Sequence, residues 1–230
     1  MTTKESQYTY LLQKKEKKGL TKLGLMMNAV WERDPKRLAF VLSRYKFVSK
    51  MLEGKKSVIE VGCGDAFASR IVAQTVGNLT VSDFDPVFID DVKSREDKLW
   101  PMDYLIHDLT QKPFDNTYDA IYLMDVFEHI DKSKENKFLK NLVSSIKNDG
   151  CVIIGIPSLE SQKNIPPEKQ DPGHVNCKSG QDFKKLMISY FDNVFLFSMN
   201  DEVVHTGYHK MANYLIVLCC SPKIKLKNTY

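Results

Sequence analysis

The chain has 230 residues, of which 43% are hydrophobic and 27% charged, and its formal net charge is +4. A chain of this length can form one domain with a substantial core, and so mild a charge does not favour nucleic acid as a partner. The five cysteines include no C-x-x-C pair and their number is odd, so we expect reduced thiols and a cytoplasmic location. No apolar run approaches the roughly 20 residues of a membrane span, and the first residues have no secretory signal pattern.

The N-terminal region is expected to be an extension or cap. Its first 24 residues are rich in lysine and have no clear apolar period. The first well-marked element is a helix over residues 35–52, where apolar side chains recur on one face. Asp34 can cap this helix and Pro35 suits its first turn.

Short β-like runs and helical stretches alternate through the middle of the chain. The predicted strands cover residues 57–61, 79–83, 103–107, 118–124 and 151–156. The predicted helices cover residues 66–76, 86–94 and 133–147, and Asp149 and Gly150 end the last of them. Such alternation is typical of a largely parallel sheet with helices on both faces.

The alternation stops after Pro157. Residues 158–177 contain three prolines and no apolar period, which predicts a long loop that acts as a lid. A helix follows over residues 180–191, and two β-like runs at 193–199 and 213–220 predict an antiparallel hairpin at the sheet edge. The predicted parts are an N-terminal extension or cap (1–35), one domain (36–222) and a basic tail (223–230).

The stretch "VIEVGCGDAFAS", residues 58–69, predicts a ligand-binding turn between a strand and a helix. A dinucleotide fingerprint needs a third glycine, but Phe67 stands there, and no Gly-Lys-Ser/Thr follows to make a phosphate loop. Glu60 beside Gly62 and Gly64 would repel a pyrophosphate but accept an ammonium group. Asp83, after the next strand, can bind a ribose diol. These residues favour a nucleoside that carries an amine.

"VIEVGCGDA" resembles the first motif of class I S-adenosylmethionine-dependent methyltransferases, Glu/Asp-x-Gly-x-Gly-x-Gly, with Ala66 in place of the last glycine. The segments "LTVSDFDP", "YLIHDLTQKPF", "YDAIYLMDVFEHI", "NDGCVIIGIPS" and "GHVNCKSGQDFKKLM" resemble later parts of the family in the same order. The resemblance covers roughly residues 40 to 220 and is nearest to the small-molecule branch that contains ubiquinone-biosynthesis O-methyltransferases. It implies a doubly wound, Rossmann-like α/β fold with a mostly parallel seven-stranded sheet.

The resemblance also implies S-adenosylmethionine as cofactor, S-adenosylhomocysteine as product, and a set of binding residues. Asp83 would bind the ribose, Asp108 the adenine amino group, and Arg44 the methionine carboxylate. The other implied contacts come from Glu60, Gly62, Cys63 and Gly64 in the first motif, from Phe84 and Leu109 against the adenine, and from the main chain near Met124. Two simpler interpretations remain open, since Asp83 could cap the next helix and Arg44 could pair with a surface carboxylate.

Methyl transfer from a sulfonium is an in-line displacement that needs alignment and, for some acceptors, removal of a proton. Asp125, Glu128 and His129 follow the fourth strand and are the candidate catalytic residues. His129 is a candidate general base because histidine titrates near neutral pH. The three residues could instead orient the loop, or hold a divalent cation; no metal site is predicted.

Three residues outside the motifs are candidates for substrate binding. His174 and His205 lie in C-terminal segments that can cover the pocket, and Trp31 lies in the N-terminal region. Tyr8 and Tyr10 would join Trp31 if the N-terminus folded over the site. In each case a solvated side chain or a place at the edge of the core is the alternative.

The predicted function is methylation of an oxygen or nitrogen atom of a small molecule, such as a sugar or a cell-envelope precursor. The alternatives are a methyltransferase acting on RNA, protein or glycan, and a protein that binds S-adenosylmethionine without catalysis. The fourth motif lacks the Asn/Asp-Pro-Pro-Tyr/Phe pattern of enzymes that methylate base amines. We therefore expect a small-molecule substrate, no nucleic acid and no membrane, and a homodimer is left open.

Overall fold

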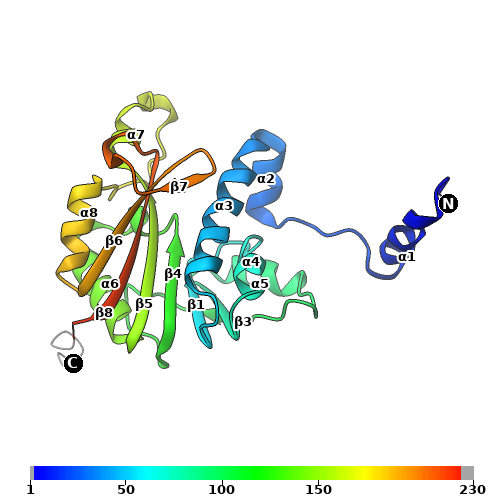
Figure 1. The fold of residues 1–230 in the computed structure, drawn as a ribbon, viewed down its shortest axis with the longest axis horizontal. Coiled ribbons are helices and arrows are strands. Elements are labelled where there is room, and N and C mark those ends of the chain that lie inside the picture. Colours follow the sequence, from blue (N-terminus) through cyan, green and yellow to red (C-terminus); the bar gives the residue numbers. More distant parts are fainter. Residues whose placement is uncertain (1–2, 224–230) are drawn as a thin grey trace.

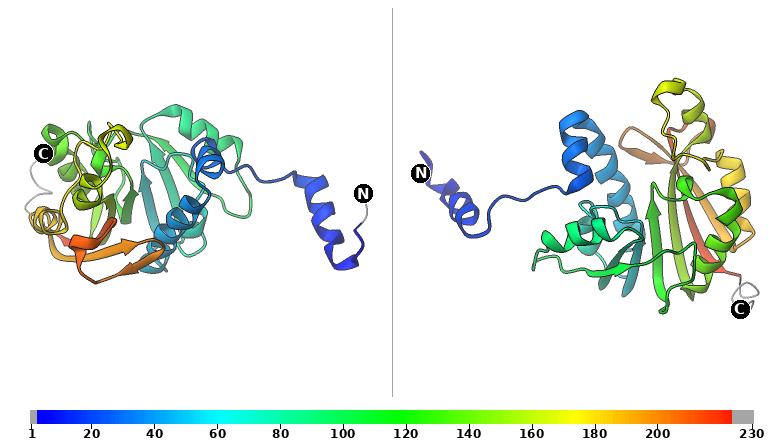
Figure 2. Two further views of the ribbon diagram at one scale, coloured as in Figure 1. Left: turned by 90° about the horizontal axis from the view of Figure 1, so that it is seen from above. Right: turned by 180° about the vertical axis from the view of Figure 1, so that it is seen from behind.

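The computed structural model describes residues 3–223 and shows one sheet with helices on both faces (Figures 1 and 2). The sheet has eight strands in the order β3-β2-β1-β4-β5-β8-β6-β7 within this range. The strands are β1 (Ser57–Val61), β2 (Asn78–Asp83), β3 (Asp103–Ile106), β4 (Tyr118–Met124), β5 (Ile146–Pro157), β6 (Phe191–Asn200), β7 (Val203–His205) and β8 (Tyr214–Pro222). The α-helices are α1 (Thr9–Lys18), α2 (Leu25–Arg33), α3 (Lys36–Met51), α4 (Ser69–Ala73), α5 (Pro86–Ser94), α6 (Lys132–Ser144), α7 (Leu159–Lys163) and α8 (Gly180–Ile188).

Strands β1 to β5 are parallel, and the strand order reverses between β1 and β4. In sheets of this kind ligands bind at the carboxyl ends of the strands beside such a reversal. The α/β, doubly wound prediction is confirmed, but the predicted seven strands are one too few, because β7 extends the sheet. The C-terminal strands do pair antiparallel, yet β8 also pairs with β5, so the outermost strand is β7 and not a β6–β8 hairpin.

The two faces of the sheet pack against different helices. Along β4 the side chains of Ile121 and Leu123 enter the core beneath α6 and α8, whereas Ala120 and Tyr122 enter the core beneath α3, α4 and α5. This alternation is what a strand buried on both faces requires. The sheet is therefore a rigid support for the loops at its carboxyl edge.

Several predicted boundaries are wrong for local reasons. Helix α6 ends at Ser144, and β5 starts at Ile146 and runs through Gly150, where the sequence predicted helix and then a turn. Ile146 fits the helical spacing of the apolar residues before it. In the structure it is buried in β5 and pairs with Tyr118 of β4, next to a register shift between the two strands. Asp34 does not cap α3 with its side chain; only its carbonyl accepts a hydrogen bond, from the N–H of Arg37.

The predicted loop at 158–177 holds two short helices, α7 and a 3₁₀ turn at Pro167–Lys169. Helix α7 starts because the Ser158 hydroxyl accepts a hydrogen bond from the N–H of Ser161 at 2.9 Å. Helices α4 and α8 are shorter than predicted, at Ser69–Ala73 and Gly180–Ile188. The basic tail lies outside the described residues from 224 onward.

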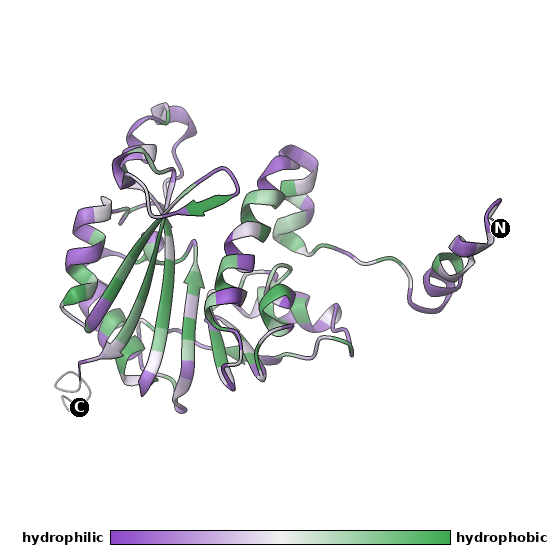
Figure 3. Cartoon of the chain, viewed as in Figure 1, coloured by the Kyte–Doolittle hydropathy of each residue, from purple (hydrophilic) through white to green (hydrophobic). Residues whose placement is uncertain are grey.

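The N-terminal part contains two helices that differ in their packing. Helix α1 buries none of its residues and stands away from the sheet at the end of an extended segment (Figure 1). Figure 3 shows that α1 is mostly hydrophilic, whereas the strands of the sheet are mostly hydrophobic. Helix α2 instead packs against α3. No helix in the described part of the chain has both the length and the apolar character to cross a membrane.

Candidate active site

The loop after β1 has the backbone conformation of a tight ligand-binding turn. Gly62 and Gly64 have φ angles of 68° and 51°, in the left-handed region where glycine is favoured. Ala66, which replaces the family's last glycine, also has a left-handed φ, of 48°. The turn therefore keeps its shape despite the methyl group, which costs roughly 1–2 kcal/mol for an L-residue in this region.

This loop is also tightly covered by neighbouring side chains. A Cβ on Gly62 would collide with the Val126 side chain, which follows β4. A Cβ on Gly64 would lie 2.6 Å from the sulfur of Met26, which belongs to α2. Glycine is thus needed here for close approach as well as for backbone conformation.

Glu60 is fully buried behind the loop and is satisfied by three hydroxyl groups. Its carboxylate accepts hydrogen bonds from Tyr45 at 2.5 Å, Tyr122 at 2.8 Å and Ser69 at 2.5 Å. Burial raises its pKa to about 7, although the three hydrogen bonds act in the opposite direction. Its oxygens face these hydroxyls inside the core, and the expected contact of Glu60 with the ammonium group of a ligand stays a prediction.

Asp83 is the last residue of β2 and contacts the glycine loop that follows β1. Its carboxylate accepts hydrogen bonds from the N–H groups of Gly64 and Asp85, both at 3.0 Å. Asp85 caps α5 by accepting from Val87, so the alternative in which Asp83 caps that helix is wrong. Asp83 keeps its proposed place beside the loop.

The side chains expected around an adenine lie at the ends of β2, β3 and β4. Phe84 is 71% exposed and offers an open aromatic face, whereas Leu109 and Met124 are buried. Partial burial raises the pKa of Asp108, but hydrogen bonds from Thr110 outweigh it and the net shift is downward. The structure therefore supplies a flat apolar face and an ionised carboxylate at this end of the sheet.

Cys63 is buried within the loop. Burial raises the pKa of its thiol far above the ordinary value, with the charge of Glu60 adding to the shift. A thiol in this state is neither a nucleophile nor a metal ligand, so only its backbone is available to a ligand.

Arg44 pairs with a carboxylate, as the simpler of the two interpretations allowed, and that carboxylate belongs to the candidate catalytic residue Asp125. Its guanidinium forms a 2.5 Å ion pair with Asp125 and lies 3.6 Å from the centre of the Tyr214 ring. Asp125 has a left-handed φ of 57°, and its N–H donates to the Tyr214 hydroxyl at 3.2 Å and the Gly155 carbonyl at 3.1 Å. Strand β8 therefore helps to hold the residue that follows β4 in its strained conformation.

Glu128 is fully buried in the short turn Phe127–His129, yet neither of its carboxylate oxygens has a hydrogen-bond partner within residues 3–223. Burial raises its pKa well above the usual range, and the charge of Asp125 adds to this. A buried carboxylate without a donor costs several kcal/mol unless a proton or a cation compensates it.

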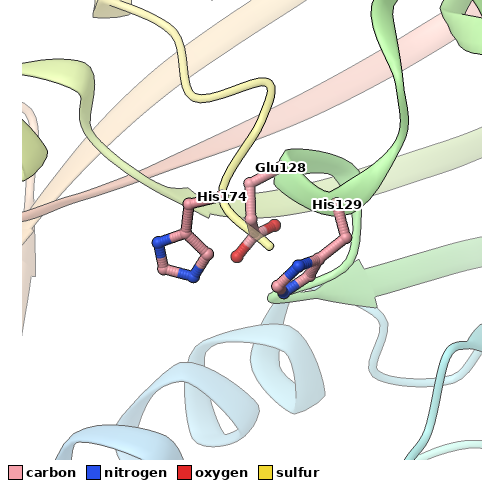
Figure 4. Close-up of side chains that lie close together, drawn as sticks. All are labelled: Glu128, His129 and His174. Atoms are coloured by element: carbon pink, nitrogen blue, oxygen red, sulfur yellow. The ribbon is translucent and has the colours of Figure 1, made fainter. Parts of the chain in front are cut away.

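Two imidazoles face this carboxylate. Ligand atoms of Glu128, His129 and His174 all lie within 4.8 Å of one another, and the carboxylate lies between the two rings in Figure 4. Nδ1 of His129 lies 2.9 Å from the Gly173 carbonyl, and Nδ1 of His174 lies 2.7 Å from Oε1 of Gln162. Because both partners are oxygen acceptors, each Nδ1 can donate the hydrogen bond, which leaves each Nε2 for another contact. Nε2 of His174 lies 3.8 Å from the carboxylate of Asp171.

The cluster fits a divalent cation. One carboxylate and two neutral imidazoles are a common donor set for transition metals, and hydrogen bonds that fix the histidine tautomer support such sites. Burial lowers the pKa of His174, which favours the neutral ligand form. The sequence placed His174 among substrate residues because it lies in an irregular loop 45 positions beyond His129; the fold brings the two rings to 5.1 Å.

Other predicted substrate residues join none of these contacts. His205 bonds to Asn200 at 3.1 Å and to the N–H of Gly207 at 3.0 Å, within the β6–β7 hairpin and the residues after it. Trp31 is 58% exposed on α2, and Tyr8 and Tyr10 are exposed on the detached N-terminal segment. The sequence missed Tyr45, Tyr122 and Tyr214, whose apolar spacing marks them only as core residues.

Comparison with known proteins agrees with this geometry. Residues 58–150 match the family model described as a methyltransferase domain. A ubiquinone biosynthesis O-methyltransferase of Rickettsia bellii is 26% identical over 160 residues, covering 60% of this chain and 61% of that protein. The mitochondrial one of Schizosaccharomyces pombe is 24% identical over 104 residues, covering 43% and 37%. The chain thus spans less than two thirds of the length of these relatives.

Solved structures show the same fold. The N-methyltransferase NodS of Bradyrhizobium japonicum, in complex with S-adenosyl-L-homocysteine, has a TM-score of 0.60 at 16% identity, covering 84% of this chain and 91% of that one. An S-adenosylmethionine-dependent methyltransferase of Clostridium acetobutylicum has a TM-score of 0.65 at 10% identity, covering 85% and 97%. The chain therefore has the fold of S-adenosylmethionine-dependent methyltransferases, and its residues 58–150 match a methyltransferase domain.

Proposed function

We propose that the protein transfers a methyl group from S-adenosylmethionine to a hydroxyl oxygen of a small molecule. The observation that carries the proposal is the buried, unpartnered carboxylate of Glu128 between two imidazoles at the carboxyl edge of the sheet. An amine acceptor can attack in its neutral form, whereas a hydroxyl must lose a proton to become a strong nucleophile. A cluster that takes up a proton or holds a cation therefore favours oxygen over nitrogen.

The cofactor would lie across the strand-order reversal. The backbone of Gly62 and Gly64 would contact its methionine part, Asp83 the ribose diol, and Phe84 and Leu109 the adenine. Asp108 is placed to accept from the adenine amino group. Arg44 would bind the methionine carboxylate by exchanging some of its present interaction with Asp125, and the neighbouring Tyr214 ring keeps the guanidinium in place.

Methyl transfer then needs only alignment and a proton acceptor. The acceptor oxygen attacks the sulfonium methyl carbon in line with the carbon–sulfur bond, whose electron pair stays on sulfur as S-adenosylhomocysteine forms. Nε2 of His129 is free to take the hydroxyl proton, since Nδ1 is held by Gly173. Asp125 and Glu128 stabilise the imidazolium that results.

Binding of a divalent cation is an alternative use of the same residues, in which His129 would be a ligand and not the base. Glu128, His129 and His174 would hold it, and it would lower the pKa of a bound hydroxyl group. The raised pKa of Glu128 supports this, because a cation would offset the cost of keeping that carboxylate ionised and buried.

The test is methyl transfer from labelled S-adenosylmethionine into a cell extract separated by size, with and without a chelator. Label in the small-molecule fraction supports the proposal, and the mass and fragmentation of the product identify the acceptor and the methylated atom. Label only in the macromolecular fraction supports an RNA, protein or glycan substrate instead. Cofactor binding without label in either fraction supports the non-catalytic alternative.

The proposal includes a small-molecule partner, no nucleic acid and a cytoplasmic location. The extension or cap at 1–35 would border the acceptor site together with the lid-like segment 158–177. Sedimentation of the purified chain distinguishes a monomer from a homodimer.

A further inference from the structure

The start of α2 lies directly across the glycine loop. The N–H of Met27 donates to the carboxylate of Asp65 at 2.7 Å, and Asp65 is itself part of the loop. Gly24 approaches so closely that a Cβ there would lie 2.6 Å from the Cβ of Asp65. The Met26 thioether covers Gly64 in the same way. Residues 24–27 therefore form a wall against the segment that would hold the cofactor.

A second carboxylate completes this attachment. Asp91 on α5 accepts from the N–H of Leu25 at 3.3 Å and from Arg95 at 2.6 Å. Arg95 in turn donates to the backbone carbonyl of Asp65 at 2.5 Å. Gly24 has no side chain to cap α2, so two carboxylates from other parts of the fold bind the free N–H groups of its first turn.

This attachment adds to the packing of α2 against α3 in holding the start of α2. Helix α1 buries no residue, and the side chains of Leu25 and Met26 are 51% and 46% exposed. A helix start with exposed apolar side chains beside a ligand-binding loop is suited to cover an apolar part of that ligand.

We propose that Asp65 is a positioning residue that couples the docking of α2 to the glycine loop, so that residues 24–27 complete the cofactor pocket. The inference rests on the proposed function, because it takes S-adenosylmethionine as the ligand. Coupling of this kind is reciprocal: docking of α2 strengthens cofactor binding, and cofactor binding stabilises docked α2.

The experiment measures the affinity for S-adenosylhomocysteine by calorimetry and hydrogen exchange of residues 19–34 with and without that ligand. The variants are Asp65→Ala, Asp91→Ala and Asp65→Asn. Asp90→Ala is the matched control, since Asp90 is an exposed neighbour on the same helix. Enzyme assays of each variant separate KM for S-adenosylmethionine from kcat.

In the wild type the ligand should slow exchange in α2 about tenfold or more, and Asp65→Ala should weaken binding about tenfold, the size expected for lost hydrogen bonds to a charged group. Asp91→Ala should act in the same direction and tests the coupling at a distance from the loop. Asp65→Asn keeps the acceptor oxygen and should restore most of the affinity. KM should rise in the alanine variants while kcat changes little.

Wild-type affinity and wild-type protection of α2 in both alanine variants would overturn the inference. An Asn variant as weak as the Ala variant would also overturn it, because the carboxylate would then matter for its charge alone. If the wild type itself does not bind S-adenosylhomocysteine, the proposed function fails first.

Discussion

Two glutamates are completely buried, one near the end of β1 and one just after β4, and the hydrogen bonding of their carboxylates differs. The carboxylate of Glu60 accepts hydrogen bonds from three hydroxyl groups, whereas the carboxylate of Glu128 has no hydrogen-bond partner among the described residues. The first carboxylate joins α3, α4 and β4 to β1, and its surroundings are complete without a ligand. The second is complete only with a proton or a bound cation. The absence of hydrogen-bond donors, and not burial alone, is the reason for proposing a role in catalysis for Glu128 and not for Glu60.

The largest expected effect comes from Glu128→Gln. We expect a loss of methyl transfer of roughly a thousandfold, the scale of removing a group that supports proton transfer. Affinity for S-adenosylhomocysteine should change less than threefold, and the free energy of unfolding should change little, because burial already favours the uncharged form of Glu128 and the amide has the same shape. Kinetics, calorimetry and urea unfolding measure the three quantities. A variant that keeps its activity but unfolds easily would reverse the roles assigned to the two glutamates.

Glu60→Ala should behave the other way. Three buried hydroxyls lose their acceptor, so we expect the free energy of unfolding to fall by roughly 3 kcal/mol or more. The kcat of the protein that remains folded should change less than fivefold. Urea unfolding gives the stability, and active-site titration with labelled cofactor corrects kcat for the folded fraction. A stable Glu60→Ala protein without activity would show that Glu60 acts in the chemistry.

The pH dependence of stability should also single out Glu60. Its pKa is about 7 in the folded protein against an ordinary value of 4.5. Its favourable contribution is therefore complete below about pH 4.5, declines as the pH rises to about 7, and is then constant. Glu60→Gln lacks this titration, so between pH 5 and 8 the variant should gain about 3 kcal/mol relative to the wild type. Parallel unfolding curves of the two proteins across this range would contradict the assignment.

The smallest effect is expected from Tyr45→Phe, which removes one of the three donors to Glu60. The remaining two hydroxyls still satisfy the carboxylate, so we expect a loss of about 1 kcal/mol at pH 8. The loss should shrink at pH 5, where Glu60 is mostly protonated. Phe47→Leu is a suitable control for aromatic packing elsewhere on α3. Equal losses from Tyr45→Phe at both pH values would show that packing, and not the hydrogen bond, is what the tyrosine supplies.

The sequence predicted the parts of the fold that are set by local pattern. Strands 57–61 and 118–124 have the predicted bounds, because each is a mostly apolar run between clear breaks. The predicted start of β5 was wrong. Ile146 fits a helix by its spacing from neighbouring apolar residues, but in the structure it pairs with Tyr118 in the sheet. The spacing of apolar residues along the chain cannot decide whether such a residue lies in a helix or in a strand, since the deciding contact comes from a distant strand.

Some features of the candidate site could also be predicted from the sequence, and others could not. The glycine loop and Asp83 are marked by residue type and position after a strand, and the structure brings them together. The partners of Arg44 and Glu60 were not predictable, since tyrosines on α3, β4 and β8 look like ordinary core residues. His174 reaches His129 only through the path of an irregular segment, which no period describes.

The position of β8 has a consequence for the order in which the molecule is built. Strand β8 pairs with both β5 and β6, although β6 precedes it in the chain. During synthesis the free edge of β5 therefore stays open, and β6 has no partner in the main sheet, until residues 214–222 have left the ribosome. Tyr214, which bonds to the N–H of Asp125 and lies against Arg44, arrives with that strand. The catalytic edge is thus among the last parts of the fold to form, and a chain stopped short of β8 would expose an unpaired apolar strand and lack a finished site.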